Sequence, residues 1–272
     1  MLRTAPIGVF DSGVGGLSVL REIQRQFPQE SLIYLADQQH VPYGPRPLAQ
    51  VRLFSVAIAR FLLDQGAKLI VVACNTASAA ALYHLREALP EVPFVGMEPA
   101  VKPAAEQTQT GVVGVLATPA TFQGRLYASV VERFASGVHL LQDTCPGLVA
   151  QIEKGVLQGP KTRTILEEAL TPMLARGIDR VVMGCTHYPF VIPLIQEIVG
   201  PEVKVIDPAP AVARQVGRVL AELEMDNQTS EPGQVRYLTS GDASKFMNLL
   251  PALMGETGSV NQIHWEQNRL AL

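Results

Sequence analysis

Two cysteines at the ends of matching apolar segments are the residues of this chain whose type and spacing best suit catalysis. Cys74 follows the segment LIVVA and Cys185 follows the segment RVVMG, and small polar residues come after each thiol. The two cysteines lie 111 residues apart, about the length of one small domain. A duplicated strand end with a duplicated thiol predicts two half-sites facing one substrate, as a reaction on both faces of one atom requires.

Other roles for these cysteines fit the sequence less well. A single buried cysteine is usually an inert core residue, but two thiols at matched positions are harder to explain in this way. A zinc site needs three or four ligands, and only His187 could join Cys74 and Cys185. A redox pair would have the Cys-x-x-Cys spacing, which these two lack. Cys145, in the segment DTCPG, has no counterpart in the other half and is interpreted as structural.

The composition is that of an ordinary globular protein. The chain has 272 residues, of which 47% are hydrophobic and 17% charged, and a formal net charge of −3. No basic cluster indicates a nucleic-acid partner, and no apolar run approaches the roughly 20 residues that span a bilayer. Three cysteines do not suggest a disulfide framework, and a predicted strand follows the N-terminus too closely for a signal sequence. We therefore expect a cytoplasmic protein with no nucleic-acid or membrane partner.

Short apolar runs alternate with longer helical patterns along most of the chain. Continuous Val, Ile and Leu runs are typical of strands buried on both faces, and their alternation with helices predicts an α/β fold with parallel sheets. The predicted strands are 7–10, 32–36, 69–73, 94–97, 112–116, 138–141, 180–183, 203–206 and 235–239. The predicted helices are 14–27, 47–65, 77–88, 119–133, 160–176, 189–199, 209–225 and 242–253.

A second internal likeness divides the chain into two halves. The segments IGVFDSG (7–13) and VGVLATP (113–119) are similar, so each half begins with a strand that ends in a polar turn. We expect two similar open, mostly parallel α/β sheets with the active site in the cleft between them, and Pro-rich crossings between the halves at 97–103 and 207–210. The predicted division is residues 1–97 plus about 211–272 for the first domain and residues 98–210 for the second.

Polar residues follow the predicted strands at the edge where ligands bind in open α/β sheets. Asp11, Cys74, Thr118 and Cys185 each end a predicted strand and precede a predicted helix. The free N–H groups and the dipole of a helix N-terminus favour an anion, so a carboxylate or phosphate ligand is expected there. The same dipole is expected to lower the pKa of a thiol from its usual value of about 8.5.

The glycine-rich segment 13–16 partly imitates a dinucleotide-binding loop. It follows a strand, opens a helix, and has an acidic residue, Asp37, 24 residues beyond Gly13. Ser18 stands where the third glycine belongs, and Asp11 would place negative charge beside the pyrophosphate. A nucleotide is therefore a minor alternative. A pyridoxal cofactor is disfavoured because no lysine ends a predicted strand in the cleft.

Four segments together resemble the signatures of glutamate racemases. They are FDSGVGGL at 10–17, PYG at 42–44, ACNTAS at 73–78 and GCTHYP at 184–189. They occur in the order and spacing of that family, and the likeness extends over essentially the whole chain. Related aspartate racemases share both cysteines but usually have a carboxylate residue in place of His187, so this histidine favours glutamate.

The resemblance implies a reaction that uses two bases and neither a cofactor nor a metal. Cys74 would act on D-glutamate and Cys185 on L-glutamate, with Asp11 assisting Cys74 and His187 assisting Cys185. Glu153, in the segment QIEKG, matches a family carboxylate near that histidine. Besides Asp11 and His187, the residues implied in binding the substrate's carboxylates and ammonium group are Ser12, Tyr43, Gly44, Asn75, Thr76, Thr118, Thr121 and Thr186.

The family likeness also implies a homodimer that supplies D-glutamate for bacterial peptidoglycan. Two alternatives stay open: a racemase of aspartate or another acidic amino acid, and a non-catalytic ligand-binding α/β protein. Assays on both amino acids separate the first alternative from glutamate racemisation. Exchange of the substrate α-hydrogen with deuterated water would be absent for the second.

Overall fold

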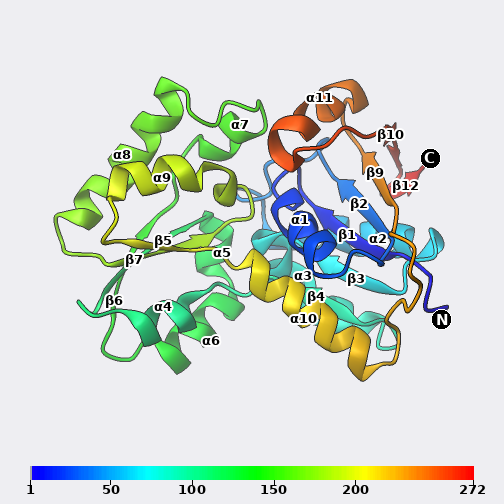
Figure 1. The fold of residues 1–272 in the computed structure, drawn as a ribbon, viewed down its shortest axis with the longest axis horizontal. Helices are drawn as coiled ribbons and strands as arrows, with labels where there is room; N and C mark the ends of the chain where they lie inside the picture. Colours follow the sequence, from blue (N-terminus) through cyan, green and yellow to red (C-terminus); the bar gives the residue numbers. More distant parts are fainter. Residues whose placement is uncertain (1) are drawn as a thin grey trace.

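Two sheets lie side by side in the computed structural model, which describes residues 2–272 (Figure 1). The first sheet has six strands in the order β10-β9-β2-β1-β3-β4, and the second has four in the order β6-β5-β7-β8. The pairings within both sheets are parallel, so the predicted α/β class is confirmed. The strands are β1 (Ile7–Asp11), β2 (Leu32–Ala36), β3 (Leu69–Val72), β4 (Phe94–Gly96), β5 (Val112–Ala117), β6 (His139–Asp143), β7 (Arg180–Gly184), β8 (Lys204–Ile206), β9 (Val235–Thr239) and β10 (Val260–Gln262).

The two sheets repeat one topology. The strands β2-β1-β3-β4 and the strands β6-β5-β7-β8 follow the same spatial order in each half. In each half the first strand is central and pairs with the strand that leads to the cysteine, β1 with β3 and β5 with β7. Because paired parallel strands end at the same edge, Asp11 comes beside Cys74 and Thr118 comes beside Cys185.

Helices cover both faces of each sheet. The helices are α1 (Leu17–Gln26), α2 (Leu48–Asp64), α3 (Asn75–Ala88), α4 (Val101–Gln107), α5 (Pro119–Gln123), α6 (Arg125–Phe134), α7 (Leu148–Ile152), α8 (Pro160–Leu174), α9 (Ile192–Val199), α10 (Ala209–Glu222) and α11 (Ala243–Met254), with a 3₁₀ turn at Tyr188–Val191. The alternating side chains of β1 show how helices cover both faces of the first sheet. Ile7 and Val9 are buried in the core with α1 and α10, whereas Phe10 is buried on the other face with α2 and α3.

The predicted strands are all present, and the differences from prediction are local. The strand β10 and the antiparallel hairpin of β11 (His264–Glu266) and β12 (Arg269–Ala271) were not predicted, because their segments VNQ, HWE and RLA contain no continuous run of Val, Ile or Leu. The Pro-rich crossing at 97–103 contains the start of helix α4, since a proline is tolerated in a first helical turn. The helix expected at 119–133 is broken at Gly124, whose extended backbone separates α5 from α6. The division into two domains at the stated boundaries stays a prediction.

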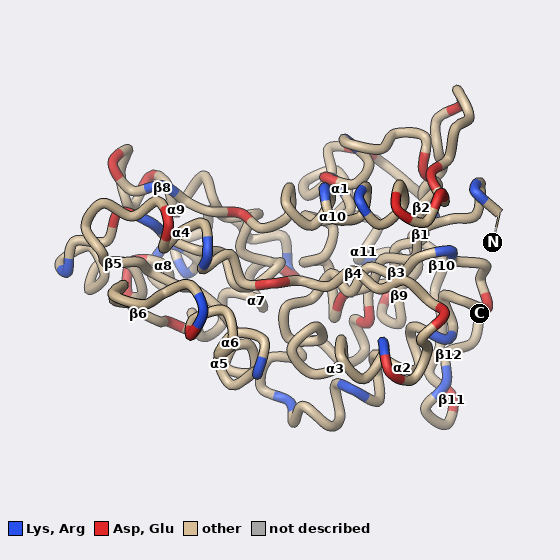
Figure 2. Tube along the Cα trace, turned by 90° about the horizontal axis from the view of Figure 1, so that it is seen from below, with Lys and Arg blue, Asp and Glu red and all other residues tan. Residues whose placement is uncertain are grey.

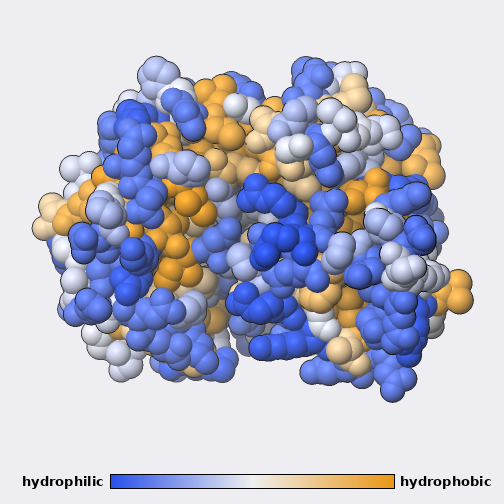
Figure 3. Space-filling view, in the orientation of Figure 1, coloured by the Kyte–Doolittle hydropathy of each residue, from blue (hydrophilic) through white to orange (hydrophobic). Residues whose placement is uncertain are grey.

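Charged residues of both signs are interspersed along both halves (Figure 2). Within residues 2–272, no helix combines the length and the apolar composition needed to cross a membrane. On the face drawn in Figure 3, hydrophilic residues gather along the seam between the two halves. This seam leads to the strand ends that carry the candidate site.

Candidate active site

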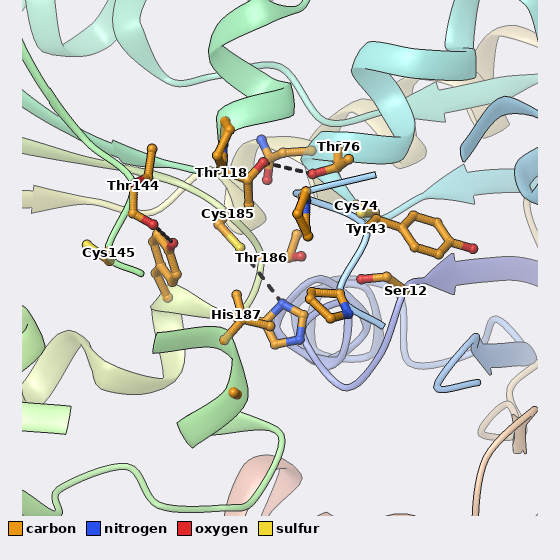
Figure 4. Close-up of a pocket in the computed structure, with 18 of the residues that line it drawn as sticks. Ser12, Tyr43, Cys74, Thr76, Thr118, Thr144, Cys145, Cys185, Thr186 and His187 are labelled. Atoms are coloured by element: carbon orange, nitrogen blue, oxygen red, sulfur yellow. Dashed lines mark hydrogen bonds between the residues drawn. The ribbon is translucent and has the colours of Figure 1, made fainter. Parts of the chain in front are cut away.

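A cavity of about 300 Å³ lies where the strand ends of the two sheets meet, and both Cys74 and Cys185 line it. Cys74 follows β3 of the first sheet and Cys185 follows β7 of the second. Figure 4 shows the two thiols on different sides of the cavity, each carried by the ribbon of its own sheet. The volume is at the lower end of the roughly 300–1,000 Å³ that is usual for small-molecule sites. The site therefore suits a small ligand reached from two sides.

Cys74 is the N-cap of α3 and is almost fully buried. Its Sγ accepts a hydrogen bond from the backbone N–H of Ala77 at 3.4 Å. Burial raises the pKa of the Cys74 thiol well above its ordinary value, and the negative charge of the adjacent Asp11 raises it further. The helix N-terminus does oppose this rise through Ala77, but it is outweighed. The expectation of a lowered pKa at this helix start was therefore wrong for Cys74.

Asp11 lies behind Cys74 and has no exposed surface. Its Oδ2 accepts the backbone N–H groups of Gly13 and Gly16, each at 3.1 Å, and Gly16 is the N-cap of α1. Its Oδ1 accepts the hydroxyl of Thr186, from the other half, at 3.3 Å. Burial raises the pKa of Asp11, while the charge of His187 opposes that rise. Asp11 thus contacts the Cys74 thiol from behind the cavity wall.

A thiol, an imidazole and a carboxylate form a chain on the other side of the cavity. Cys185 Sγ lies 3.8 Å from His187 Nδ1, and His187 Nε2 lies 2.6 Å from Glu153 Oε1. Burial alone would lower the pKa of His187, but its bonds to Cys185 and Glu153 raise that pKa well above its usual value. Burial alone would likewise raise the pKa of Glu153, yet the bond from His187 lowers it. The pair is therefore an imidazolium held against a carboxylate.

The glycine-rich loop 13–16 is shaped by this pair. A Cβ at Gly13 would lie 1.9 Å from Glu153 Oε1, and a Cβ at Gly15 would lie 2.3 Å from His187 Nδ1. The N–H of Val14 donates to Glu153 Oε1 at 2.8 Å. The glycines therefore permit close approach of the other half, and the space that a pyrophosphate would need above the loop is filled by two side chains.

Polar groups from both halves line the rest of the cavity. Of the residues implied in substrate binding, eight lie on its wall: Ser12, Tyr43, Gly44, Asn75, Thr76, Thr118, Thr186 and His187. Both amide atoms of the buried Asn75 lack a partner among the described residues, so they are available to a ligand. The hydroxyls of Thr76 and Thr118 lie 2.8 Å apart and join the two halves at this wall.

Two of the expected substrate contacts, Asp11 and Thr121, do not line the cavity. Thr121 is behind the cavity wall, where its hydroxyl lies 3.0 Å from that of Thr118 and its N–H donates to the same oxygen, because Thr118 is the N-cap of α5. Tyr43 reaches the wall, but its hydroxyl points away from the cavity and donates to Asp37 at 2.6 Å (Figure 4). Burial raises the pKa of that phenol well above its ordinary value.

One wall of the cavity was not found from the sequence. It is formed by Thr144, Pro146, Gly147, Val149, Ala150 and Tyr188, together with Cys145. Cys145 has a left-handed backbone (φ +42°) and is buried, which raises the pKa of its thiol. A turn signal, the Pro-Gly pair at 146–147 after a predicted strand, was the only local sign of this wall.

A metal centre has no support in the geometry of the described chain. Among residues 2–272, no three His, Cys, Asp or Glu side chains come close enough together to hold an ion.

Known proteins share this fold and sequence. The model of the Asp/Glu/Hydantoin racemase family matches residues 7–216. The chain belongs to this family. A glutamate racemase from Ectopseudomonas mendocina is 52% identical over 258 residues, which are 94% of this chain and 97% of that protein. The sequence likeness to glutamate racemases is thus confirmed.

Solved structures of glutamate racemases agree. The enzyme from Bacillus anthracis superposes with a TM-score of 0.86 at 32% identity, covering 98% of this chain and 99% of that one. The enzyme from Francisella tularensis, in complex with D-glutamate, superposes with a TM-score of 0.83 at 30% identity, covering 96% and 97%.

The ion pair of this racemase predicts a pH-dependent loss of stability in Glu153→Gln. Because the pKa of His187 is raised by folding, its contribution is full below about pH 6.5 and is lost as pH rises through the raised value. Because the pKa of Glu153 is lowered, its contribution is full above about pH 4.5. We expect the variant to lose about 2–3 kcal/mol of unfolding free energy near pH 6, and less at alkaline pH.

Urea unfolding at both pH values measures this loss, and NMR titration of the imidazole should show a lower pKa for His187 in the variant. Glu197→Gln is the matched control, because Glu197 pairs with Arg163 on the exposed surface. An equal loss at both pH values would contradict the ion pair.

Proposed function

We propose that this protein interconverts L- and D-glutamate without a cofactor, using Cys74 and Cys185 as the two bases. The observation that carries this proposal is the pair of thiols, from matched strand ends of two sheets, that line one small cavity. Each thiol has its own ionisable neighbour, Asp11 for Cys74 and His187 with Glu153 for Cys185. The glutamate racemases that resemble the chain support the choice of substrate.

In this mechanism one thiolate removes the α-proton of glutamate and the other thiol delivers a proton to the opposite face. Abstraction breaks the Cα–H bond and forms an S–H bond on one cysteine, and delivery breaks the S–H bond of the other cysteine and forms a new Cα–H bond on the opposite face. One turnover therefore leaves the two cysteines in exchanged protonation states. Cys74 would act on D-glutamate after passing its proton to Asp11, and Cys185 would act on L-glutamate, with His187 holding the proton that this sulfur exchanges.

The electrostatics of the site support this division of labour. A buried thiol is a poor acid, but the ammonium group of an arriving amino acid brings positive charge that favours a thiolate. The carbanion that forms at the α-carbon has no cofactor to delocalise it, so preorganised donors and exclusion of water must stabilise it. Donors at the cavity wall suited to the carboxylates are the hydroxyls of Ser12 and Thr76 and the amide of Asn75.

The wider role follows from the family likeness. D-glutamate would be supplied for bacterial peptidoglycan by a cytoplasmic homodimer. A racemase of aspartate is the alternative, and His187 in the second cysteine motif disfavours it. Incubating the purified protein with each enantiomer of both amino acids distinguishes the two, because the circular dichroism of the true substrate decays to zero.

Replacing either cysteine tests the two-base mechanism. Cys74→Ser and Cys185→Ser should each lower racemisation by at least about a thousandfold, since a hydroxyl is a far weaker acid than a thiol and general acid–base catalysis is worth about 10²–10⁴-fold. The measurement is the decay of optical rotation from each enantiomer, with far-UV circular dichroism to verify the fold. Cys145→Ser, at the third thiol of the cavity wall, is the matched comparison and should lower turnover far less than the other two variants. Near-normal turnover in either of the first two variants would refute the mechanism.

Asn75→Leu should move stability and binding in opposite directions. Leucine has a similar size and removes two buried polar atoms that have no partner in the described chain, so the free protein should gain about 1–2 kcal/mol of unfolding free energy. The same change removes a donor and an acceptor from the cavity wall and should raise the KM for glutamate about tenfold or more. Thermal unfolding and initial rates measure the two effects. A variant that is less stable and has an unchanged KM would show that Asn75 is only structural.

A further inference from the structure

Asp37, the acidic residue of the imperfect dinucleotide pattern, is the acceptor of a buried cluster. It directly follows β2 and is fully buried. Its Oδ2 accepts the hydroxyl of Tyr43 at 2.6 Å and lies 2.9 Å from Nδ1 of His40. Its Oδ1 accepts the hydroxyl of Ser240 and the indole N–H of Trp265, each at 2.7 Å. Polar atoms of four side chains thus contact this carboxylate, so its hydrogen bonds are made within the protein and not to a nucleotide.

The donors come from segments far apart in the sequence. Ser240 follows β9, and Trp265 lies in β11, the first strand of the C-terminal hairpin. The indole ring also stands edge-on to His40 with ring centroids 5.0 Å apart, and His40 stacks on Phe54 of α2 at 3.9 Å. Figure 1 shows the C-terminal strands at the side of the first sheet, away from the seam between the halves. The cluster therefore connects the C-terminal hairpin to the loop after β2.

That loop, residues 42–45, forms part of the cavity wall. The hydroxyl of Tyr43 faces Asp37, so what the loop offers a ligand is mainly its backbone. Within residues 2–272, the backbone N–H groups of Tyr43 and Gly44 donate to no acceptor. A Cβ at Gly44 would lie 3.0 Å from Cβ of Thr118, so the loop also packs against the second half. A small displacement of this loop would move its N–H groups relative to the ligand.

We infer that Trp265 is a positioning residue for this substrate loop: its indole N–H holds the Asp37 carboxylate in the orientation that fixes Tyr43 and, with it, the backbone of residues 42–45. This inference rests on the proposed glutamate site and assigns the C-terminal hairpin a part in it. Trp265 itself is remote from the reacting atoms and acts through Asp37.

Loss of the indole N–H has a definite physical consequence. One oxygen of a buried carboxylate loses a hydrogen bond and keeps Ser240 as its close neutral donor. A bond to a charged group contributes more than a neutral one, so the carboxylate gains freedom to turn and Tyr43 turns with it. The loop binds the ground state and the transition state alike, so loosening it should raise KM and change kcat little.

The experiment compares Trp265→Phe, which keeps an aromatic ring and removes the N–H, with Glu266→Gln as a control on the same hairpin. Glu266 is exposed and makes no side-chain contact with Asp37. We expect KM for both glutamate enantiomers to rise about five- to twentyfold in Trp265→Phe, with kcat within about threefold of the parent. Combining it with Tyr43→Phe should raise KM less than the product of the two single effects, because both act through Asp37.

Hydrogen exchange gives a readout that needs no substrate. Amides of residues 38–46 should exchange faster in Trp265→Phe than in the parent and in Glu266→Gln. An unchanged KM, or unchanged exchange over these residues, overturns the inference. If the parent protein does not racemise glutamate, the proposed function fails and the exchange result alone decides the inference.

A second variant covers the case in which phenylalanine disturbs the hairpin. Trp265 is the single tryptophan of the chain, so growth on β-(3-benzothienyl)alanine replaces this residue alone. The analogue matches the indole in shape and has sulfur in place of the N–H. It should reproduce the raised KM and the faster exchange of residues 38–46, and failure to do so overturns the inference.

Discussion

One buried carboxylate, Glu153, holds together the two halves on which the site depends. One of its oxygens accepts from His187 and from the backbone of Val14, and the other accepts the amide of Gln38 at 3.0 Å. His187, like Glu153, belongs to the second half of the chain, whereas Val14 and Gln38 belong to the first half. Because an unpaired carboxylate buried in the seam would be strongly unfavourable, the halves must meet in the arrangement that satisfies it. Gly13 faces Glu153 and Gly15 faces His187. Because neither glycine has a side chain, the two halves have room to meet here.

Burial acts on the ionisable groups of both sides of the cavity, but the resulting pKa shifts differ between the two sides. On the Cys74 side, burial raises the pKa of both the thiol and Asp11. On the Cys185 side, the contacts of His187 with Cys185 and Glu153 raise the pKa of the imidazole against the effect of burial. A racemase must begin each direction with one sulfur ready to accept a proton and the other ready to give one. The different surroundings of the two thiols, on which the charge of a bound amino acid also acts, are compatible with that requirement.

The sequence predicted the strands and the half-sites well because both depend on local signals. Continuous apolar runs mark β3 and β7, and the polar residues after each run mark the edge where ligands bind. Predictions failed where the outcome depends on how a residue is packed in three dimensions. Thr121 has the residue type of a ligand contact, yet it supports Thr118 from behind. The helix N-terminus at Cys74 does act on the thiol, but burial beside Asp11 is stronger, and burial cannot be judged from the segment alone.

By itself, the sequence determined which residues are reactive and which strands carry them: two thiols, their polar neighbours and the order of the elements. The tertiary structure alone decided contacts that neither the local pattern nor the family likeness had indicated. The hydroxyl of Thr186 meets Asp11 across 175 residues, and the indole of Trp265 meets Asp37 across 228. The physical reason is that hydrogen bonding and desolvation depend on distances between side chains. Those distances are set only when segments far apart in the sequence pack against each other.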